Sequence, residues 1–403
     1  MSRLSEMIRE MCPDGVEYRK LGEILSRHKG IAITAGRMKE LHTPNGEIRI
    51  FAAGNTYADV MESDVDRDGI IREPAIIVKS RGNIGFEYYT KPFSHKNEMW
   101  SYTTNHAFIS LKYVYYVLEQ NMAYFQNKAK TGKLPQISIS DTENYEIPVP
   151  PLLIQNEIVK LLDNFTELTA ELTAELLLRK KQYNFYRDAL LTFAPADDTI
   201  VQTDRQTDRQ AQRIGKIDLL KESVEVEWKT LQNIATSIFS GNNKNKSLSG
   251  TYPVYGSTDI IGWTTQGRYS KKNILVARVG VYAGFVQFVD GCYDVSDNTL
   301  VVDVSDEVNI KYIFYYLKHM NLNHLARGGG QPLITAGQLK KLNIPIPPLE
   351  VQQKIVSILD RFDTLCNDLT QGLPAEIAAR RKQYAYYRDK LLTFPKSKPA
   401  GRS

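Results

Sequence analysis

Apolar residues between positions 152 and 193 recur with the spacing of one face of an α-helix. Ile158, Leu161 and Phe165 begin a series with steps mostly of three, four or seven that continues to Phe193. Such spacing places apolar side chains on a single stripe, as in coiled coils. Neither proline nor glycine occurs in 152–193, so the pattern predicts one uninterrupted helix of about 60 Å at ~1.5 Å per residue.

A second stretch, 349–394, carries the same periodicity but is interrupted. Val351, Ile355 and Ile358 open its apolar series, and Gly372-Leu373-Pro374 stands in the middle of it. Glycine favours the end of a helix, and proline favours the first turn of a new one. We therefore predict a second long helix with a kink near 372–374.

The two helical stretches end in nearly the same sequence. Residues 179–193 read RKKQYNFYRDALLTF and residues 380–394 read RRKQYAYYRDKLLTF, with identity at eleven of fifteen positions. Upstream of each helix, IPVPP at 147–151 matches IPIPP at 344–348. Self-similarity of this kind indicates an internal duplication.

Each copy also contains a long segment that the other does not resemble. VEY at 16–18 and VEW at 226–228 mark the starts, and from there to the IPxPP motifs the copies share little identity. Short β-branched runs such as 48–51 and 75–78 alternate there with glycine and asparagine turns. We predict an α/β (α+β) domain in each copy, followed by its helix. The expected boundaries are 1–151 for the first domain, 152–194 for its helix, 195–222 for a polar linker, 223–348 for the second domain, 349–394 for the second helix and 395–403 for a tail.

Composition narrows the class of protein only slightly. The 51 Lys and Arg against 46 Asp and Glu leave a net charge of +5, so contact with a polyanion would have to come from local clusters. Cys12, Cys292 and Cys366 lie too far apart for a disulfide framework or a zinc knuckle. The first ten residues lack the apolar core of a signal peptide, and no window is apolar enough to span a bilayer. We expect a protein of a reducing cytoplasm that neither crosses nor enters a membrane.

Motifs for catalysis are missing from the sequence. It has neither the glycine-rich cofactor loop of an adenine methyltransferase nor the GxxxxGK[ST] loop of an ATP-driven motor. Glu227-Trp228-Lys229 could belong to a nuclease core, but no suitably spaced upstream acid accompanies it. His319 and His324 lie five residues apart, which does not align two metal ligands on one helical face. We predict a chain without catalytic residues and without a metal site.

Basic and amide side chains gather in the turns of the two domains. Long cations can clamp phosphates, while arginine, asparagine and glutamine can read base edges. The alternative is that these residues are ordinary solvated surface groups. For the turn residues that recur at equivalent places in both copies the two interpretations stay open, and for Lys244, Lys246, Lys271 and Lys272 a solvated charge cluster is the default. The candidates for contact with nucleic acid are Lys79, Arg81, Asn83, Lys130, Lys133, Gln136, Lys244, Lys246, Lys271, Lys272, Arg278, Tyr282, Arg327 and Gln331.

A tandem unit stands in the middle of the first helix. Thr169-Ala170-Glu171-Leu172 is followed by an identical Thr173-Ala174-Glu175-Leu176, and one such unit adds about 6 Å and roughly 40° of rotation to a helix. Together with the duplicated RKKQYxxYRDxLLTF signature and the two dissimilar domains, this TAEL pair resembles the specificity subunits of type I restriction-modification systems, particularly the IC group. The resemblance spans nearly the entire chain.

This resemblance implies a division of labour. Each domain would be a target-recognition domain that reads one half of a bipartite site in double-stranded DNA. The two helices would pair as an antiparallel coiled coil and set the spacer between the halves, one TAEL unit corresponding to about one or two base pairs at ~3.4 Å each. Two methyltransferase subunits would dock on the helices and bring S-adenosylmethionine, and motor-nuclease subunits would use ATP and Mg. The chain itself would bind no cofactor, in the cytoplasm of a bacterium or archaeon.

Two other interpretations stay open. The repeated domains could bind peptides or proteins, which would make the chain a non-catalytic adaptor; failure to bind duplex DNA even with a methyltransferase present would favour it. An enzyme in its own right has the least support in the residues, and turnover by the purified chain alone would favour it.

Overall fold

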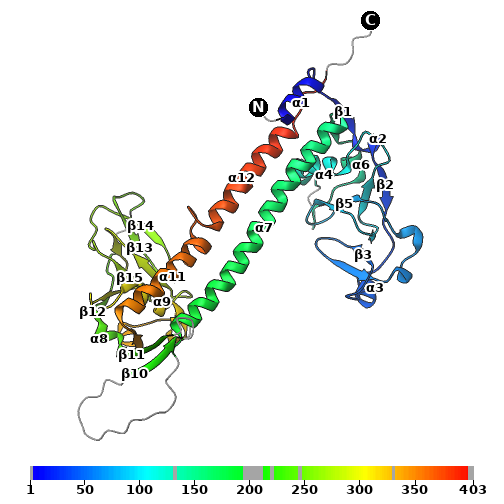
Figure 1. The fold of residues 1–403 in the computed structure, drawn as a ribbon. Helices are drawn as coiled ribbons and strands as arrows, with labels where there is room; N and C mark the ends of the chain where they lie inside the picture. Colours follow the sequence, from blue (N-terminus) through cyan, green and yellow to red (C-terminus); the bar gives the residue numbers. More distant parts are fainter. Residues whose placement is uncertain are drawn as a thin grey trace, which may run out of the picture. The chain divides into compact units, whose positions relative to one another are not determined.

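The computed structural model describes residues 3–129, 134–193, 212–217, 222–243, 247–328 and 332–397. The chain divides into two compact units, Met1–Leu172 with Ile377–Ser403, termed unit 1, and Thr173–Glu376, termed unit 2. The longest helix, α7 (Leu152–Leu191), gives its first half to unit 1 and its second half to unit 2 (Figure 1).

Unit 1 is built on two larger sheets and one two-stranded sheet. Its elements are α1 (Arg3–Met11), β1 (Glu17–Lys20), α2 (Leu21–Ile24), β2 (Ser26–Lys29), α3 (Ala35–Leu41), β3 (Ile48–Phe51), β4 (Tyr57–Val60), η1 (Glu62–Asp64), η2 (Arg67–Gly69), β5 (Ala75–Lys79), β6 (Gly85–Tyr89), β7 (Phe93–His95), β8 (Trp100–Thr103), α4 (Leu111–Gln120), α5 (Met122–Lys128), α6 (Ile139–Glu143), β9 (Glu146–Val149) and, at the C-terminal side, most of α12 (Leu373–Leu391). One sheet has the antiparallel order β2-β8-β5-β6, and the other has the order β4-β3-β7 with β3 and β7 parallel. Helix α4 covers the first sheet, where Val114 and Leu118 share a core with Ile76 and Val78.

Unit 2 repeats this arrangement. Its elements are β10 (Gln212–Ile217), β11 (Glu222–Thr230), α8 (Leu231–Ile234), β12 (Ala235–Ser240), β13 (Tyr252–Tyr255), β14 (Ile260–Thr264), β15 (Asn273–Ala277), β16 (Val286–Val289), β17 (Asp294–Val295), β18 (Thr299–Val304), α9 (Ile310–His319), η3 (Leu322–Leu325), α10 (Ala336–Lys340), β19 (Asn343–Ile346) and α11 (Leu349–Asn367). The order β12-β18-β15-β16 repeats the first sheet, and β14-β13-β17 repeats the second, its parallel pair included. The predicted fold class, a duplicated α/β domain with paired long helices, is confirmed.

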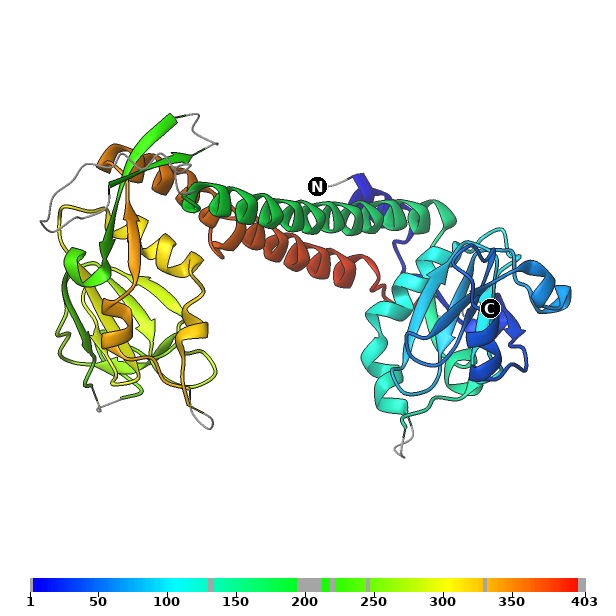
Figure 2. The same cartoon turned by 90° about the horizontal axis from the view of Figure 1, so that it is seen from below.

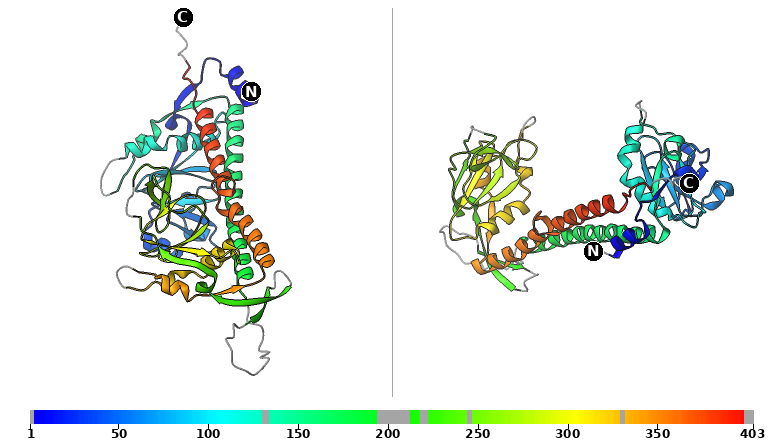
Figure 3. Two further views of the ribbon diagram at one scale, coloured as in Figure 1. Left: turned by 90° about the vertical axis from the view of Figure 1, so that its left-hand side faces the viewer. Right: turned by 90° about the horizontal axis from the view of Figure 1, so that it is seen from above.

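Aromatic side chains join the helices inside each unit. In unit 1, α12 runs antiparallel to the first half of α7 (Figure 2). The ring of Phe165 on α7 stacks on Tyr387 of α12, with 5.6 Å between centroids. In unit 2, α11 lies beside the second half of α7 (Figure 3). There the rings of Tyr183 and Tyr186 on α7 lie 6.3 and 5.2 Å from the ring of Phe362 on α11. The coiled-coil stripe of α7 therefore contacts a different helix in each unit.

The helical run after position 349 is divided into α11 and α12. Asp368, the residue after α11, accepts hydrogen bonds from the backbone amides of Thr370 (2.7 Å) and Gln371 (3.2 Å). A Cβ atom on Gly372 would lie 2.4 Å from the carbonyl oxygen of Thr364, so the chain can turn this tightly only at a glycine.

A buried glutamine fixes each α/β domain to the helix that follows it. Gln155, in the first turn of α7, accepts a hydrogen bond from the amide of Ser110 (2.8 Å) and donates to the proline carbonyl five residues upstream (2.7 Å). Gln352 on α11 makes the same two bonds, with the amide of Asn309 and the upstream proline carbonyl, both at 2.8 Å. Both side chains are almost completely buried, so the bonds are formed away from water.

A carboxylate about two turns further along reinforces each junction. Asp163 on α7 accepts from Lys112 Nζ (2.7 Å) and from the hydroxyl of Tyr116 (2.5 Å), both on α4. Asp360 makes the equivalent bonds to a lysine and a tyrosine of α9, at 2.6 and 2.7 Å. Burial, and then the hydrogen bond to Asp163, raises the pKa of the Tyr116 hydroxyl, which stays a donor.

The end of the described chain returns to its beginning within unit 1. The amide of Val16 donates to the carbonyl of Pro395, and the amide of Ser397 donates to the carbonyl of Val16, both at 2.9 Å. The hydroxyl of Tyr18 adds a 2.7 Å bond to the carbonyl of Phe394. Among the described residues, no helix combines the length and apolar character needed to span a membrane.

Candidate nucleic-acid interface

In unit 1, three of the predicted contact residues lie on two paired segments just beyond the end of β5. Residues 80–84 and 134–137, termed the loop edge of unit 1, form an antiparallel bridge between Arg81 and Gln136. Flanking backbone groups join the segments through hydrogen bonds of 2.8 and 3.0 Å. Asn83 is exposed on the same turn. Positions 55 residues apart in sequence are thus held in one place.

The side chains of this bridge are also bonded to each other. Arg81 donates to Gln136 Oε1 through Nε (3.3 Å) and Nη2 (3.0 Å). Because a guanidinium group only donates, the amide of Gln136 must turn its oxygen towards Arg81. Gly82, with φ of +76°, lets the chain turn directly after the arginine.

Unit 2 has the same backbone arrangement beyond β15. Residues 278–285, Arg327 and residues 332–334 are termed the loop edge of unit 2. The amide of Gly280 donates to the carbonyl of Pro332 (3.0 Å), as Gly82 does to Pro135 in unit 1 (2.8 Å). The loop edge of unit 2 therefore brings the predicted Arg278, Tyr282 and Arg327 together.

The shared backbone bonds show which residues of the two edges correspond. With Gly82 matched to Gly280, Arg278 takes the place of Ser80, whereas Arg81 corresponds to Val279. The turns recur at equivalent places, as expected, but the arginines within them do not. A shift of one residue along an extended segment moves a side chain to the opposite face, so Arg81 and Arg278 point in different directions from a common frame.

Arg278 lies partly inside its loop edge. Its amide donates to the carbonyl of Asn298 (2.9 Å), and its Nη1 donates to Ser240 Oγ (3.3 Å). Its Nε is buried and has no hydrogen-bond partner among the described residues. Ser80, at the same place in unit 1, is short and donates to the carbonyl of Glu98 (2.5 Å); there a hollow of ≈ 450 Å³ opens beside Gln136.

The turn between β15 and β16 presents apolar side chains to solvent. Val281, Tyr282 and Phe285 are 84%, 63% and 44% exposed. The turn is well fixed, because the amide of Phe285 donates to the carbonyl of Tyr282 (2.9 Å) and Asn323 Nδ2 donates to the carbonyl of Ala283 (2.9 Å). Sequence reasoning singled out Tyr282 but missed Val281 and Asn323, which carry no charge that would have drawn attention.

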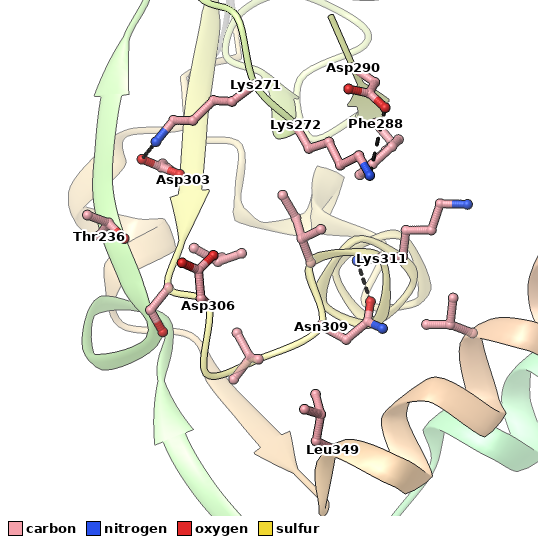
Figure 4. A pocket seen from close by; sticks show the side chains of 15 residues that line it. Thr236, Lys271, Lys272, Phe288, Asp290, Asp303, Asp306, Asn309, Lys311 and Leu349 are labelled. Carbon is pink, nitrogen blue, oxygen red and sulfur yellow. Dashed lines mark hydrogen bonds and ion pairs between the residues drawn. The ribbon is translucent and has the colours of Figure 1, made fainter.

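Three predicted lysines lie away from the loop edges or are paired. Lys79 forms a 2.8 Å ion pair with Glu87 across the β5–β6 pair. Lys271 is bonded to Asp303, and Lys272 lies 3.9 Å from Asp290, at the rim of a hollow of ≈ 960 Å³ (Figure 4). These two lysines precede β15, whereas Arg278 follows it, so a strand of about 17 Å separates them at ~3.3 Å per residue.

The remaining predictions fall partly outside the described chain. Lys130, Lys133, Lys244, Lys246 and Gln331 lie outside the described residues. The TAEL pair lies within α7, where Leu172 and Leu176 are half-buried and Glu171 and Glu175 are exposed. No cluster of three or more potential metal-ligating residues occurs in the part of the chain that the structure describes.

Comparison with known proteins shows which protein family this chain resembles. A model of the type I restriction modification DNA specificity domain matches residues 13–179 and again residues 223–379. The specificity subunit of the type I restriction enzyme EcoR124I/EcoR124II from Escherichia coli is 35% identical over 320 residues, 71% of either chain. That of the Escherichia coli enzyme EcoprrI is 28% identical over 396 residues, covering 92% of this chain and 93% of its own.

A solved structure shares the fold. The crystal structure of a type I restriction-modification S subunit from M. genitalium aligns with a TM-score of 0.63 and 17% identity, over 94% of this chain and 96% of that one. The two matches of the family model each cover one copy of the repeat, and together they cover most of the chain. The protein therefore belongs to the family of type I restriction-modification specificity subunits, with one DNA specificity domain in each half.

Proposed function

We propose that the loop edges of unit 1 and unit 2 each contact one half of a bipartite site in double-stranded DNA. The observation that carries this proposal is the repeated backbone frame: two copies of one hydrogen-bonded edge carry different exposed side chains. A shared frame with divergent side chains is what two readers of two different sequences require, since base edges are distinguished by side-chain chemistry.

The contact residues divide into two kinds. We propose that one kind faces bases or the adjacent backbone of DNA: Arg81, Asn83 and Gln136 in unit 1, and Arg278, Tyr282 and Arg327 in unit 2. Lysines at 79, 130, 133, 244, 246, 271 and 272, with Gln331, are proposed to contribute phosphate or peripheral contacts, which supply affinity and salt dependence rather than sequence preference.

The long helices are proposed to set the spacer and to dock the catalytic subunits. Helix α7 belongs to both units, so residues 169–176 are a natural place to change the distance between two half-sites. Two methyltransferase subunits would bring S-adenosylmethionine, and motor-nuclease subunits would bring ATP and Mg. This chain would recognise the DNA site and catalyse no reaction, in the cytoplasm of a bacterium or archaeon.

Sequencing of methylated adenines tests the proposal. The chain is co-expressed with its methyltransferase in a host that lacks other adenine methylation, and single-molecule sequencing reports the modified motif. We expect a split, asymmetric motif with an unspecified spacer. A single continuous motif, or methylation that does not depend on this chain, would contradict the proposal; a complex that binds no duplex DNA would favour the adaptor interpretation.

A further inference from the structure

We propose that the two loop edges select different bases by different chemistry: the edge of unit 1 selects a guanine through hydrogen-bond donors alone, and the edge of unit 2 selects a thymine through its methyl group. This inference rests on the proposed function, in which each edge faces the bases of one half-site. It adds the identity of one base in each half.

The guanine preference follows from the pairing of Arg81 with Gln136. A free glutamine matches adenine in the major groove, because its oxygen accepts from adenine N6 while its nitrogen donates to N7. Here the oxygen of Gln136 is already occupied by two donors of Arg81, at 3.0 and 3.3 Å. What the pair still offers is N–H groups only, from Gln136 Nε2 and from the remaining guanidinium hydrogens.

Guanine is the base whose major-groove edge fits such a surface. Its N7 and O6 are two neighbouring acceptors, whereas adenine places a donor beside its acceptor. A donor-only surface would leave the adenine N6 hydrogens without an acceptor. The backbone bridge between Arg81 and Gln136 holds both side chains in register before DNA arrives, so selecting adenine instead would first require the side-chain bonds to break.

The equivalent positions in unit 2 cannot read a base by hydrogen bonds. Arg81 and Gln136 are replaced there by Val279 and Leu333, which form the corresponding backbone bridge. Beside them, Val281 and Tyr282 are 84% and 63% exposed. Isolated exposed apolar residues are common, but a group of them on one surface marks a recognition site.

The turn that carries these residues is held outward. Besides the bond from Asn323 to the turn, Gly284 is packed so closely that a Cβ atom there would lie 2.5 Å from the amide nitrogen of Asn323. With φ of +92° at Gly284 and +82° at Gly280, the turn has a backbone that favours glycine at both ends. This fixed backbone presents Val281 and Tyr282 to solvent.

Charge indicates which partner covers this apolar surface. Arg278 and Arg327 both belong to this edge, and Arg327 is exposed where its backbone pairs with Leu333, so the edge carries two cations, as suits a polyanion. In duplex DNA the apolar group exposed in the major groove is the C5 methyl of thymine. Thymine is thus the base that the edge of unit 2 is built to prefer.

Base analogues test the thymine half of the proposal. Once the site is known, duplexes with deoxyuridine in place of each thymine in turn are titrated with the complete chain and its methyltransferase, at one salt concentration. We expect about fourfold weaker binding at one position, as for one methyl group left unburied. The variant Val281→Ser should lose this sensitivity, while Leu248→Ser, which alters an exposed leucine of another loop, should keep it.

The guanine half is tested in the same assay with 7-deazaguanine, which lacks the N7 acceptor. We expect about tenfold or greater loss at one guanine of the other half-site, with that sensitivity abolished in Arg81→Ala and in Gln136→Ala. The control Arg37→Ala removes an exposed arginine that forms an ion pair with Glu40 and should change nothing.

The outcomes separate this inference from the proposed function. A split motif whose binding ignores every deoxyuridine and every 7-deazaguanine would overturn the inference and leave the function intact. Loss of methyltransferase co-purification in Val281→Ser, with normal base discrimination, would assign the apolar turn to a protein partner and overturn the thymine assignment. Absence of any split motif would defeat the proposed function itself.

Discussion

The two α/β domains of this chain share a backbone and differ in the side chains placed on it. In unit 1 the loop edge carries the hydrogen-bonded pair Arg81 and Gln136, and in unit 2 the same positions carry Val279 and Leu333. The junctions between the domains and the helices, by contrast, keep the same side chain in both copies, because Gln155 and Gln352 make matching hydrogen bonds. Positions that hold the fold together are thus kept in both copies, and positions at the loop edge are free to differ.

The two units also differ at equivalent buried positions in their cores. His95 in unit 1 is completely buried and lies 3.0 Å from Ser101 Oγ. The strand pairing places Val295 and Val301 at these positions in unit 2. Burial lowers the pKa of His95 to about 4. The two units should therefore respond differently to acid.

The largest effect is expected from changing α7, which both units share. Inserting a third TAEL unit after Leu176 should abolish methylation of the original site and create a new site with the same half-sites and a spacer about one or two base pairs wider. Methylome sequencing of the variant measures this. Glu171→Gln keeps the helix length and serves as the control; an unchanged spacer after the insertion would contradict the role of α7 as a ruler.

Removing the buried glutamines should cost the most stability. Gln155→Ala or Gln352→Ala leaves buried backbone groups without partners, at about 1–3 kcal/mol for each group, so we expect about 3 kcal/mol in either unit by urea unfolding. The next residue in each copy, Asn156 or Gln353, is exposed, and its alanine variants are the matched controls. A large cost in only one unit would show that the two junctions are not equivalent.

Acid should destabilise unit 1 through His95. The folded-state pKa of about 4 lies below the ordinary value of 6.5, so the unfolded state takes up the proton first. The contribution of neutral His95 to the free energy of unfolding is then fully present above pH 6.5. It is lost as the pH drops towards 4, by about 3 kcal/mol in total. The double variant His95→Val/Ser101→Val copies unit 2 and should lose about 2 kcal/mol less than the wild type between pH 7 and 4.5. Equal losses would show that His95 is not the titrating group.

A smaller effect is expected at the carboxylate of each junction. Asp163→Asn and Asp360→Asn each weaken a partly exposed ion pair with lysine and a hydrogen bond from a tyrosine hydroxyl. We expect each variant to lower the free energy of unfolding by about 1 kcal/mol. Thermal unfolding should show similar shifts for both variants. A shift in one variant alone would indicate that the second lysine and tyrosine pair is incidental.

Much of the architecture could be predicted from the sequence. The duplicated helix endings revealed the repeat, and the predicted runs 48–51 and 75–78 lie on β3 and β5. These predictions succeeded because the spacing of apolar residues and the repeated motifs can be seen in the sequence itself, and apolar spacing indicates which side chains are buried. The loop edges were harder, because Arg81 meets Gln136 across 55 residues and no local pattern encodes that contact.

The sequence also misled on which edge residues correspond. Arg81 and Arg278 both follow a β-branched strand, so they look equivalent until the hydrogen bonds of Gly82 and Gly280 fix the register. Val281 passed unnoticed, because a single exposed valine is ordinary and only its fixed turn makes it informative. Side-chain direction depends on tertiary pairing, and the sequence of one chain does not specify that pairing.

The most direct measurement compares the methylated motifs of two variants, Arg81→Ala and Arg278→Ala, each co-expressed with the methyltransferase, with that of the wild type. If the two loop edges serve separate half-sites, each variant should relax or change one half only, and the two variants should affect opposite halves. If both variants weaken the two halves equally, the edges do not read separate sequences.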